Sequence, residues 1–345
     1  MDAYRIVLAN RPQGAPKEED FRLERFEPPA LNAGEVLVRT IWLSLDPYMR
    51  GRMDAAKSYA TPVELNETMQ GGGVAEVVES NDKAFPVGCI VTGAVGWASH
   101  AVMNGTGLRR VDPELAPIST ALGILGMPGH TAWVGLNDIA RAAPGETIVV
   151  SAATGAVGSV VGQLARRAGL KVIGVAGGAD KCSYAEQHLG YDICLDHKAF
   201  ENGDDLGVAI KNAAPSGVDI YYENVAGKTL EAVIGNMNTN GRIAVCGMIS
   251  WYSGRGIAEA MALPVVWRAI LTRRLRVEGF IIFDHQDRFQ PFIDEVGPLV
   301  NGGELFYHET IAEGLAAAPR AFMGLLQGDN LGKQLVRVGP DTCPK

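Results

Sequence analysis

The chain has 345 residues, with 31 Lys or Arg, 39 Asp or Glu and a formal net charge of −8 at pH 7. This length suits two packed domains better than one hydrophobic core. A negative surface repels the phosphates of nucleic acids and anionic lipids, so we expect neither nucleic acid nor a membrane as a partner. No signal-peptide pattern opens the sequence and the five cysteines are scattered, which favours a cytoplasmic protein with free thiols.

Residues 1 to about 125 contain short β-like runs separated by Gly and Pro. The runs at 35–40 and 73–78 are examples. This pattern predicts an irregular, mostly antiparallel β domain.

From about residue 145, predicted strands alternate with helices, which is typical of a doubly wound parallel sheet in an α/β protein. The predicted strands are 147–152, 171–176, 218–224, 242–247 and 276–282. A final segment, 312–338, predicts a helix followed by a strand at 333–338, and on pattern alone it could belong to either domain.

The segment 147–159 runs from an apolar strand through a turn of small residues into an amphipathic helix. Gly155 and Gly158, separated by Ala156 and Val157, occupy the second and third glycine positions of G-x-G-x-x-G, while Ala153 replaces the first. Such glycines let a pyrophosphate approach the backbone at a helix N-terminus. This context predicts a Rossmann-type dinucleotide site, and the alternative is a tight turn without a ligand.

The tip of the second predicted strand distinguishes NAD from NADP. NAD enzymes usually place an acid there to hold the ribose 2′-hydroxyl. Here the strand ends in Gly177 and Gly178, Asp180 lies beyond the tip, and Lys181 follows. A lysine attracts a 2′-phosphate, so we predict NADPH as the cofactor, although Lys181 could also be an ordinary solvated lysine.

No metal-binding pattern such as H-E-x-x-H or C-x-x-C includes any of the six histidines or five cysteines, and no G-x-S-x-G motif is present. We therefore expect a metal-independent oxidoreductase in which the nicotinamide carries the chemistry.

Six segments in order resemble one family, the zinc-free medium-chain dehydrogenase/reductases of the leukotriene B4 dehydrogenase and prostaglandin reductase group. This group includes plant double-bond reductases and bacterial enzymes of the curcumin reductase type. The segments are LSLDPYMR at 43–50, LGMPG at 125–129, SAATGAVG at 151–158, YENV at 222–225, AVCGMIS at 244–250 and GDNLGK at 328–333.

The resemblance implies a GroES-like catalytic domain at 1–125, completed by 306–345, with a Rossmann NADP-binding domain inserted at 126–305. It also implies reduction of the carbon–carbon double bond of α,β-unsaturated ketones or aldehydes. A homodimer is expected, in which Rossmann sheets pair edge to edge and 280–282 lies on a candidate edge strand.

By the same resemblance, cofactor contacts are expected along the Rossmann domain and once beyond it. They are Gly155, Ala156, Val157, Gly158, Lys181, His197, Asn224, Cys246, Gly247, Tyr252, Phe280, Ile281, Ile282 and Asn330. Cys246 is expected to act through its backbone position and not as a nucleophile.

Two positions depart from the family. His197 replaces a usual Tyr near the 2′-phosphate, which makes the local charge depend on pH. Gly72 replaces an aromatic residue, which suggests a reshaped substrate pocket.

A tyrosine hydroxyl can donate to the carbonyl oxygen of an enone as that oxygen becomes an enolate. We expect Tyr252 to be the catalytic residue and Tyr48 and Tyr59 to contact the substrate; the alternative is that these rings only pack. Rival functions on this scaffold are a quinone reductase, a zinc alcohol dehydrogenase and a cofactor-binding protein without turnover.

Overall fold

Two compact units make up the chain, which the computed structural model describes over residues 2–56, 58–254, 257–258 and 260–343. The first unit combines Met1–Gly126 with Glu309–Lys345, and the second is the intervening segment Met127–His308. The chain therefore leaves the first unit once and returns to it. No helix in these described ranges is long and apolar enough to cross a membrane.

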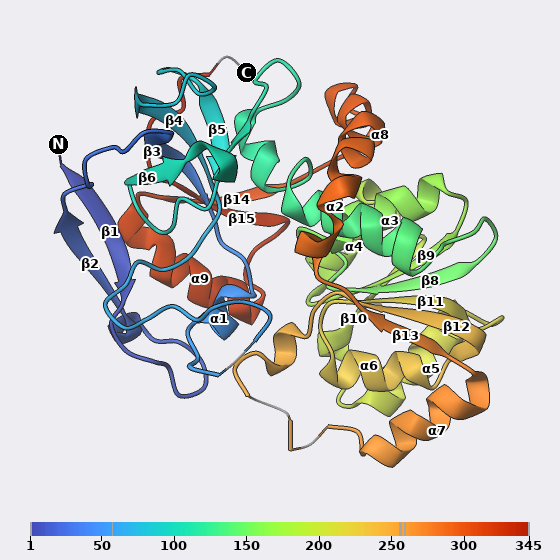
Figure 1. Cartoon of the computed structure of the whole chain (residues 1–345). Helices are drawn as coiled ribbons and strands as arrows, with labels where there is room; N and C mark the ends of the chain where they lie inside the picture. Colours follow the sequence, from blue (N-terminus) through green and yellow to red (C-terminus); the bar gives the residue numbers. More distant parts are fainter. Residues whose placement is uncertain (1, 57, 255–256, 259, 344–345) are drawn as a thin grey trace. The chain divides into compact units, whose positions relative to one another are not determined.

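The second unit is built on a six-stranded sheet in which every pair of neighbouring strands is parallel (Figure 1). The strand order is β10-β9-β8-β11-β12-β13, so the chain moves outward from β8 to β10 and then returns to the other side of β8. This reversal between β8 and β11 is the switch point at which doubly wound sheets bind ligands. The strands are β8 (Thr147–Ser151), β9 (Lys171–Ala176), β10 (Ile193–Asp196), β11 (Val218–Glu223), β12 (Met237–Val245) and β13 (Arg276–Gly279).

Helices cover both faces of this sheet, with α3 on one face and α5, α6 and α7 on the other (Figure 1). Leu206 and Ile210 of α5 pack with Val233 of α6 against Val149 and Tyr221 of the sheet. Burial on both faces explains the apolar run at 148–150 in the middle of β8, a strand whose five residues are all buried. The helices are α2 (Met127–Val134), α3 (Gly158–Arg167), α4 (Ala179–His188), α5 (Gly203–Ala213), α6 (Gly227–Ile234), α7 (Leu263–Arg273) and α8 (Phe289–Asn301).

The first unit contains a mostly antiparallel sheet of order β14-β15-β3-β4-β5-β7, with β6 also paired to β3, and a separate β1-β2 pair. Its strands are β1 (Ala3–Leu8), β2 (Phe21–Phe26), β3 (Glu35–Ser44), β4 (Gly73–Ser80), β5 (Ile90–Gly93), β6 (His100–Asn104), β7 (Arg109–Arg110), β14 (Glu309–Glu313) and β15 (Lys333–Arg337). Its helices are α1 (Met49–Arg52) and α9 (Ala318–Gln327).

The C-terminal segment completes the hydrophobic core of the first unit. Strand β15 pairs antiparallel with β3, and Phe322 of α9 meets the buried ring of Trp97 edge to face at 5.6 Å. Phe21 stacks on the same Trp97 ring at 5.5 Å. The helix and strand predicted within 312–338 therefore form, and they belong with the N-terminal β structure.

The predicted α/β class, with a Rossmann parallel sheet and a mostly antiparallel β domain, is confirmed. Two predicted strands have wrong bounds. Residues 276–282 are predicted as a single strand, but β13 ends at Gly279 and a 3-10 helix begins at Ile282. Residues 242–247 are predicted as a strand, but β12 runs from Met237 to Val245. Strand β10 was not predicted, because it is only four residues long.

Candidate functional site

The turn between β8 and α3 forces the backbone into close contact with itself. The amide of Gly155 donates to the carbonyl oxygen of Ala152 at 2.9 Å, and Ala152 has a φ of +50°. A Cβ on Gly158 would lie 2.3 Å from that same oxygen, and one on Gly155 would lie 3.2 Å from it. Only glycine fits at 158, so the first turn of α3 begins directly against the end of β8.

Ala153 replaces the first glycine of the motif because the space around it suits one methyl group. Its amide donates to the carbonyl oxygen of Val175 on β9 at 3.1 Å, and its side chain is fully buried. Opposite it stands Gly174, where a Cβ would come within 2.9 Å of the Ala153 Cβ. The methyl group lost at 174 compensates for the one gained at 153.

At the switch point, Ser151 and Asn224 join the ends of β8 and β11. Asn224 donates its backbone amide to the Ser151 hydroxyl at 2.8 Å and its side-chain amide to the Ser151 carbonyl oxygen at 2.8 Å. These two bonds fix Asn224 beside the turn between β8 and α3.

Glu223 is a buried carboxyl group at the same place, only 2% exposed. Its Oε1 accepts from the Ser151 hydroxyl at 3.0 Å and from the amides of Val225 at 2.7 Å and Ala226 at 2.9 Å. Burial raises the pKa of Glu223, while the two amide bonds oppose that rise. The carboxyl group thereby holds a turn in which Ala226 has a φ of +68°.

The residues after β12 are ordered by Glu223 and Tyr252. The amides of Cys246 and Gly247 both donate to the Glu223 carbonyl oxygen, at 2.9 and 3.0 Å. The Tyr252 hydroxyl accepts from the amide of Met248 at 3.3 Å, and a Cβ on Gly247 would lie 3.2 Å from this hydroxyl. Burial raises the pKa of Cys246 to about 12, which keeps its thiol protonated and a poor nucleophile.

The tip of β9 carries a group of positive charges around His197. A Cβ on Gly177 would lie 2.9 Å from Nε2 of His197 and 3.1 Å from Cε of Lys198. Lys228 donates to the carbonyl oxygen of His197 at 2.7 Å. Burial lowers the pKa of His197, and the charges of Lys228, Lys198 and Lys181 lower it further, against an opposing effect of Asp196.

Phe280 and Ile281 follow β13 at the same edge of the sheet, where the Phe280 amide approaches the Val245 carbonyl oxygen at 3.4 Å. Since Glu223 is in register with Val245, and Val245 with Gly279, the carboxyl ends of β11, β12 and β13 are level. The structure therefore brings the predicted cofactor residues of the second unit to one edge of one parallel sheet, although Ile282 lies in a 3-10 helix and not in a strand.

Tyr48, Tyr59 and Asn330 lie in the first unit. Asn330 donates its side-chain amide to the Gly332 carbonyl oxygen at 2.8 Å, just before β15. Tyr48 precedes α1, and its pKa is raised by burial and by the charge of Asp46, so its hydroxyl stays protonated at neutral pH. The Tyr59 side chain is exposed.

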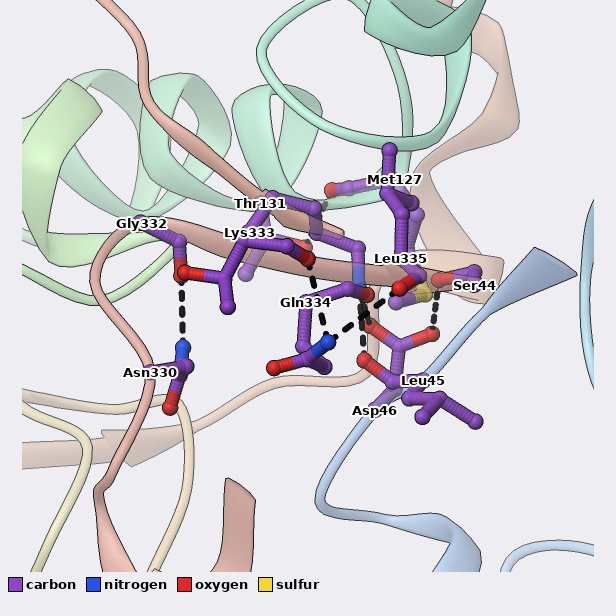
Figure 2. A network of polar contacts seen from close by, with 11 residues as sticks. Ser44, Leu45, Asp46, Met127, Thr131, Asn330, Gly332, Lys333, Gln334 and Leu335 are labelled. Carbon is purple, nitrogen blue, oxygen red and sulfur yellow. Dashed lines mark hydrogen bonds and ion pairs between the residues drawn. The ribbon is translucent and has the colours of Figure 1, made fainter. Parts of the chain in front are cut away.

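A buried ion pair connects the segments that carry Tyr48 and Asn330. Lys333 at the start of β15 donates to Oδ1 of Asp46 at 3.1 Å and to the Leu45 carbonyl oxygen at 2.5 Å, and Asp46 also accepts from the Ser44 hydroxyl (Figure 2). Asp46 and Lys333 are each 5% exposed or less. Because the Lys333 ammonium group and both carboxylate oxygens of Asp46 have partners, the pair fixes both segments.

Sequence reasoning missed Glu223, Lys198 and Lys228. Glu223 lies inside the YENV segment, where only Asn224 was assigned a role, and an acid ending a buried strand is a signal that could have revealed it. Lys228 lies 31 residues after His197, so only the fold shows that the two are neighbours. Among the described residues, no group of three or more His, Cys, Asp or Glu is arranged to hold a metal ion.

Comparisons with known proteins agree with this arrangement. Residues 4–111 match the family model described as the N-terminal domain of oxidoreductase, and residues 156–297 match the one described as zinc-binding dehydrogenase. The chain is 46% identical to the NADPH-dependent curcumin reductase of Escherichia coli (strain K12) over 98% of this chain and 97% of the relative.

Two further proteins show the same similarity along nearly the whole chain. The 2-alkenal reductase (NADP(+)-dependent) of Nicotiana tabacum is 39% identical, over 96% of each chain. The crystal structure of CurA from Vibrio vulnificus in complex with NADPH is 43% identical and superimposes with a TM-score of 0.93, covering 98% of this chain and 100% of that one.

Proposed function

The chain belongs to the zinc-independent medium-chain dehydrogenase/reductase family, and from this premise we propose that it uses NADPH to reduce the carbon–carbon double bond of α,β-unsaturated ketones and aldehydes. The relatives named for NADPH-dependent curcumin reduction and for NADP-dependent 2-alkenal reduction support this assignment.

The observation that carries the proposal is the contact of Gly158 with Ala152 at the switch point of the sheet. Because a Cβ at 158 would collide with the Ala152 carbonyl oxygen, the glycine brings the first turn of α3 against the end of β8, where the helix dipole favours the negative charge of a pyrophosphate. Asn224, Cys246 and Gly247 border the same edge of the sheet and are proposed to contact the rest of the cofactor, together with Phe280 and Ile281. Ile282 and Asn330 are also proposed to contact the cofactor, and only the resemblance to the family supports these two assignments.

The lysines near the tip of β9 favour the phosphorylated cofactor. Lys181, Lys198 and Lys228 each act on the pKa of His197 in the direction expected of nearby cations. Such a cluster attracts a ribose 2′-phosphate, whereas β9 itself ends without the acid typical of NAD enzymes. The carboxylate nearest the tip, Asp196, accepts from the amides of Gly178 at 2.8 Å and Lys198 at 2.9 Å. We therefore assign Lys181 and His197, with Lys198 and Lys228, to the 2′-phosphate.

When bound, the reduced nicotinamide supplies a hydride to the β-carbon of the enone. The protein must orient the enone and stabilise the negative charge that develops on its carbonyl oxygen. We assign that hydrogen-bond donor to the Tyr252 hydroxyl, whose position is fixed by the Met248 amide. Tyr48 and Tyr59 are proposed to contact the substrate, and the protonated Tyr48 hydroxyl is proposed as a second donor to it.

We also propose a GroES-like catalytic domain at 1–125 with 306–345, a Rossmann NADP-binding domain at 126–305, and a cytoplasmic homodimer. The dimer is supported by β13, the strand at one edge of the sheet, and by an apolar row on α7. Leu263, Trp267 and Leu271 recur every four residues there and are 63%, 59% and 77% exposed. All five cysteines are free, which suits the cytoplasm.

Steady-state oxidation of NADPH with 4-phenylbut-3-en-2-one tests the function. The proposal predicts turnover with NADPH that exceeds turnover with NADH by about tenfold or more, the size of effect expected from one charge-assisted phosphate contact. A quinone and a simple alcohol with NADP⁺ serve as rival substrates. Higher kcat/KM with either rival, or NADPH binding without any turnover, would overturn the proposal.

A further inference from the structure

Arg52 is a cation held between two tyrosine rings in the first unit. It is the last residue of α1, and its Cζ lies 5.4 Å from the ring centroid of Tyr48 and 5.1 Å from that of Tyr59. Its Nη1 donates to Oε1 of Gln70 at 3.2 Å and to the carbonyl oxygen of Thr61 at 3.4 Å. These neutral partners hold the guanidinium in place without neutralising its charge.

The carboxylates closest to Arg52 in sequence are paired with other cations. Asp46 binds Lys333 at 3.1 Å, and Asp54 binds Arg50 at 2.7 Å. Within the described ranges, no carboxylate lies at ion-pair distance from Arg52. The positive charge of Arg52 is therefore locally uncompensated, in a chain whose net charge is −8.

Arg50, two residues earlier in the same helix, is an arginine whose charge and hydrogen-bond donors are engaged by the protein itself. Its side chain is only 4% exposed, and its Nη1 pairs with Asp54. Its Nε and Nη2 both donate to the Gly14 carbonyl oxygen, at 3.0 and 2.8 Å. Arg52 is only half-buried, and its Nε and Nη2 make no hydrogen bond with any residue that the structure describes.

We propose that Arg52 makes this reductase select enones that carry a carboxylate group in addition to the reacting double bond. The inference rests on the proposed function, because Tyr48 and Tyr59, the rings that Arg52 stacks on, are the proposed substrate contacts. A guanidinium binds a carboxylate through two parallel hydrogen bonds, and stacking between rings fixes the plane in which these donors lie. Because the acidic chain as a whole repels anions, such a substrate needs a local cation.

The test compares 4-phenylbut-3-en-2-one with its para-carboxy and meta-carboxy analogues, which differ only in a charge remote from the double bond. Wild-type protein is expected to prefer at least one carboxylate in kcat/KM. Arg52→Gln is expected to lower that preference by about tenfold or more, through KM, and to leave the neutral enone nearly unchanged. Arg52→Lys, which keeps the charge but not the planar donors, should retain part of the preference.

Arg110 supplies a matched control, because it stacks on Phe85 at 5.9 Å in the same unit and carries the same charge. Arg110→Gln should leave the preference intact, and added salt should reduce the preference of wild-type protein but not that of Arg52→Gln. Equal kcat/KM for all three enones in wild-type protein, or a parallel loss on all three in Arg52→Gln, would overturn the inference while leaving the proposed function standing. Failure of wild-type protein to reduce any of them would overturn both.

Discussion

Gly158 lies so close to Ala152 that a Cβ added to the glycine would stand 2.3 Å from the alanine carbonyl oxygen. This contact sets the distance between the end of β8 and the first turn of α3. The Ser151–Asn224 bonds and the Glu223 carboxyl group lie at the same place, where β8 and β11 end.

Replacing Gly158 by alanine should therefore push α3 away from β8. We expect Gly158→Ala to destabilise the protein by about 1–3 kcal/mol, as overpacking usually does, and to weaken NADPH binding by more than tenfold. Urea unfolding and fluorescence titration measure the two effects. Gly235→Ala is the control, because a Cβ there meets nothing within 4 Å. Unchanged NADPH affinity in Gly158→Ala would remove the turn from the cofactor site.

His197 should make NADPH affinity depend on pH. Burial and the neighbouring lysines lower its pKa below the ordinary 6.5, so the imidazole is neutral at pH 7 and gains a positive charge only as the pH falls. The affinity for NADPH, relative to that of His197→Gln at the same pH, should rise between pH 7.5 and 5.5. The ratio removes the titration of the phosphate itself, which is common to both proteins.

The same lowered pKa has an opposite consequence for stability. The native state holds the His197 proton less tightly than the unfolded chain does, so the free energy of unfolding contributed by this group falls as the pH drops below 6.5. Parallel pH profiles of NADPH affinity in wild-type protein and His197→Gln would show that His197 is remote from the phosphate. Parallel pH profiles of the free energy of unfolding would show that the pKa of His197 is the same in the folded and unfolded protein.

Tyr252→Phe should lower kcat more than it weakens NADPH binding, because it removes the proposed donor to the enolate oxygen and only one 3.3 Å bond from the Met248 amide. We expect a loss of about 10- to 100-fold in kcat, within the range for removing one donor to a developing oxyanion. Stopped-flow reduction of an enone and equilibrium titration with NADPH separate the two quantities. Tyr4→Phe, an exposed tyrosine of the β1 strand, is the control. Wild-type turnover in Tyr252→Phe would exclude this hydroxyl from the mechanism.

Glu223→Ala should destabilise the second unit more than Glu223→Gln. The alanine leaves the amides of Val225 and Ala226 without their acceptor, and we expect a loss of about 3 kcal/mol. Glutamine keeps an accepting oxygen and should lose about half as much. Denaturant unfolding followed by circular dichroism measures both, with the exposed Glu201→Ala as the control. Equal stability of the two variants at position 223 would show that these amide bonds contribute little.

Patterns of apolar residues and glycines along the sequence predicted those strands whose ends are set by neighbouring residues. Strand β9 begins and ends at the predicted residues, because a mostly apolar run is bounded by Gly169 and Gly177. Strand β13 ends three residues early, because Phe280 and Ile282 are apolar whether they continue a strand or begin a 3-10 helix. Hydrophobicity alone cannot distinguish these outcomes.

Local sequence patterns could not predict the site residues that meet partners far away in the sequence. Lys228 and His197 meet only because α6 and the segment after β10 lie at the same edge of the sheet. The pairing of Lys333 with Asp46 spans 287 residues and depends on β15 joining β3. Arg52 was passed over because its neighbours in sequence do not show that its charge lacks a counterion.

The central claim is that the double bond, and not the carbonyl group, receives the hydride. Incubating the protein with NADPH and 4-phenylbut-3-en-2-one and identifying the product by mass spectrometry and NMR tests this claim most directly. The account predicts the saturated ketone, 4-phenylbutan-2-one. The unsaturated alcohol, or recovery of unreacted enone with unoxidised NADPH, would contradict it.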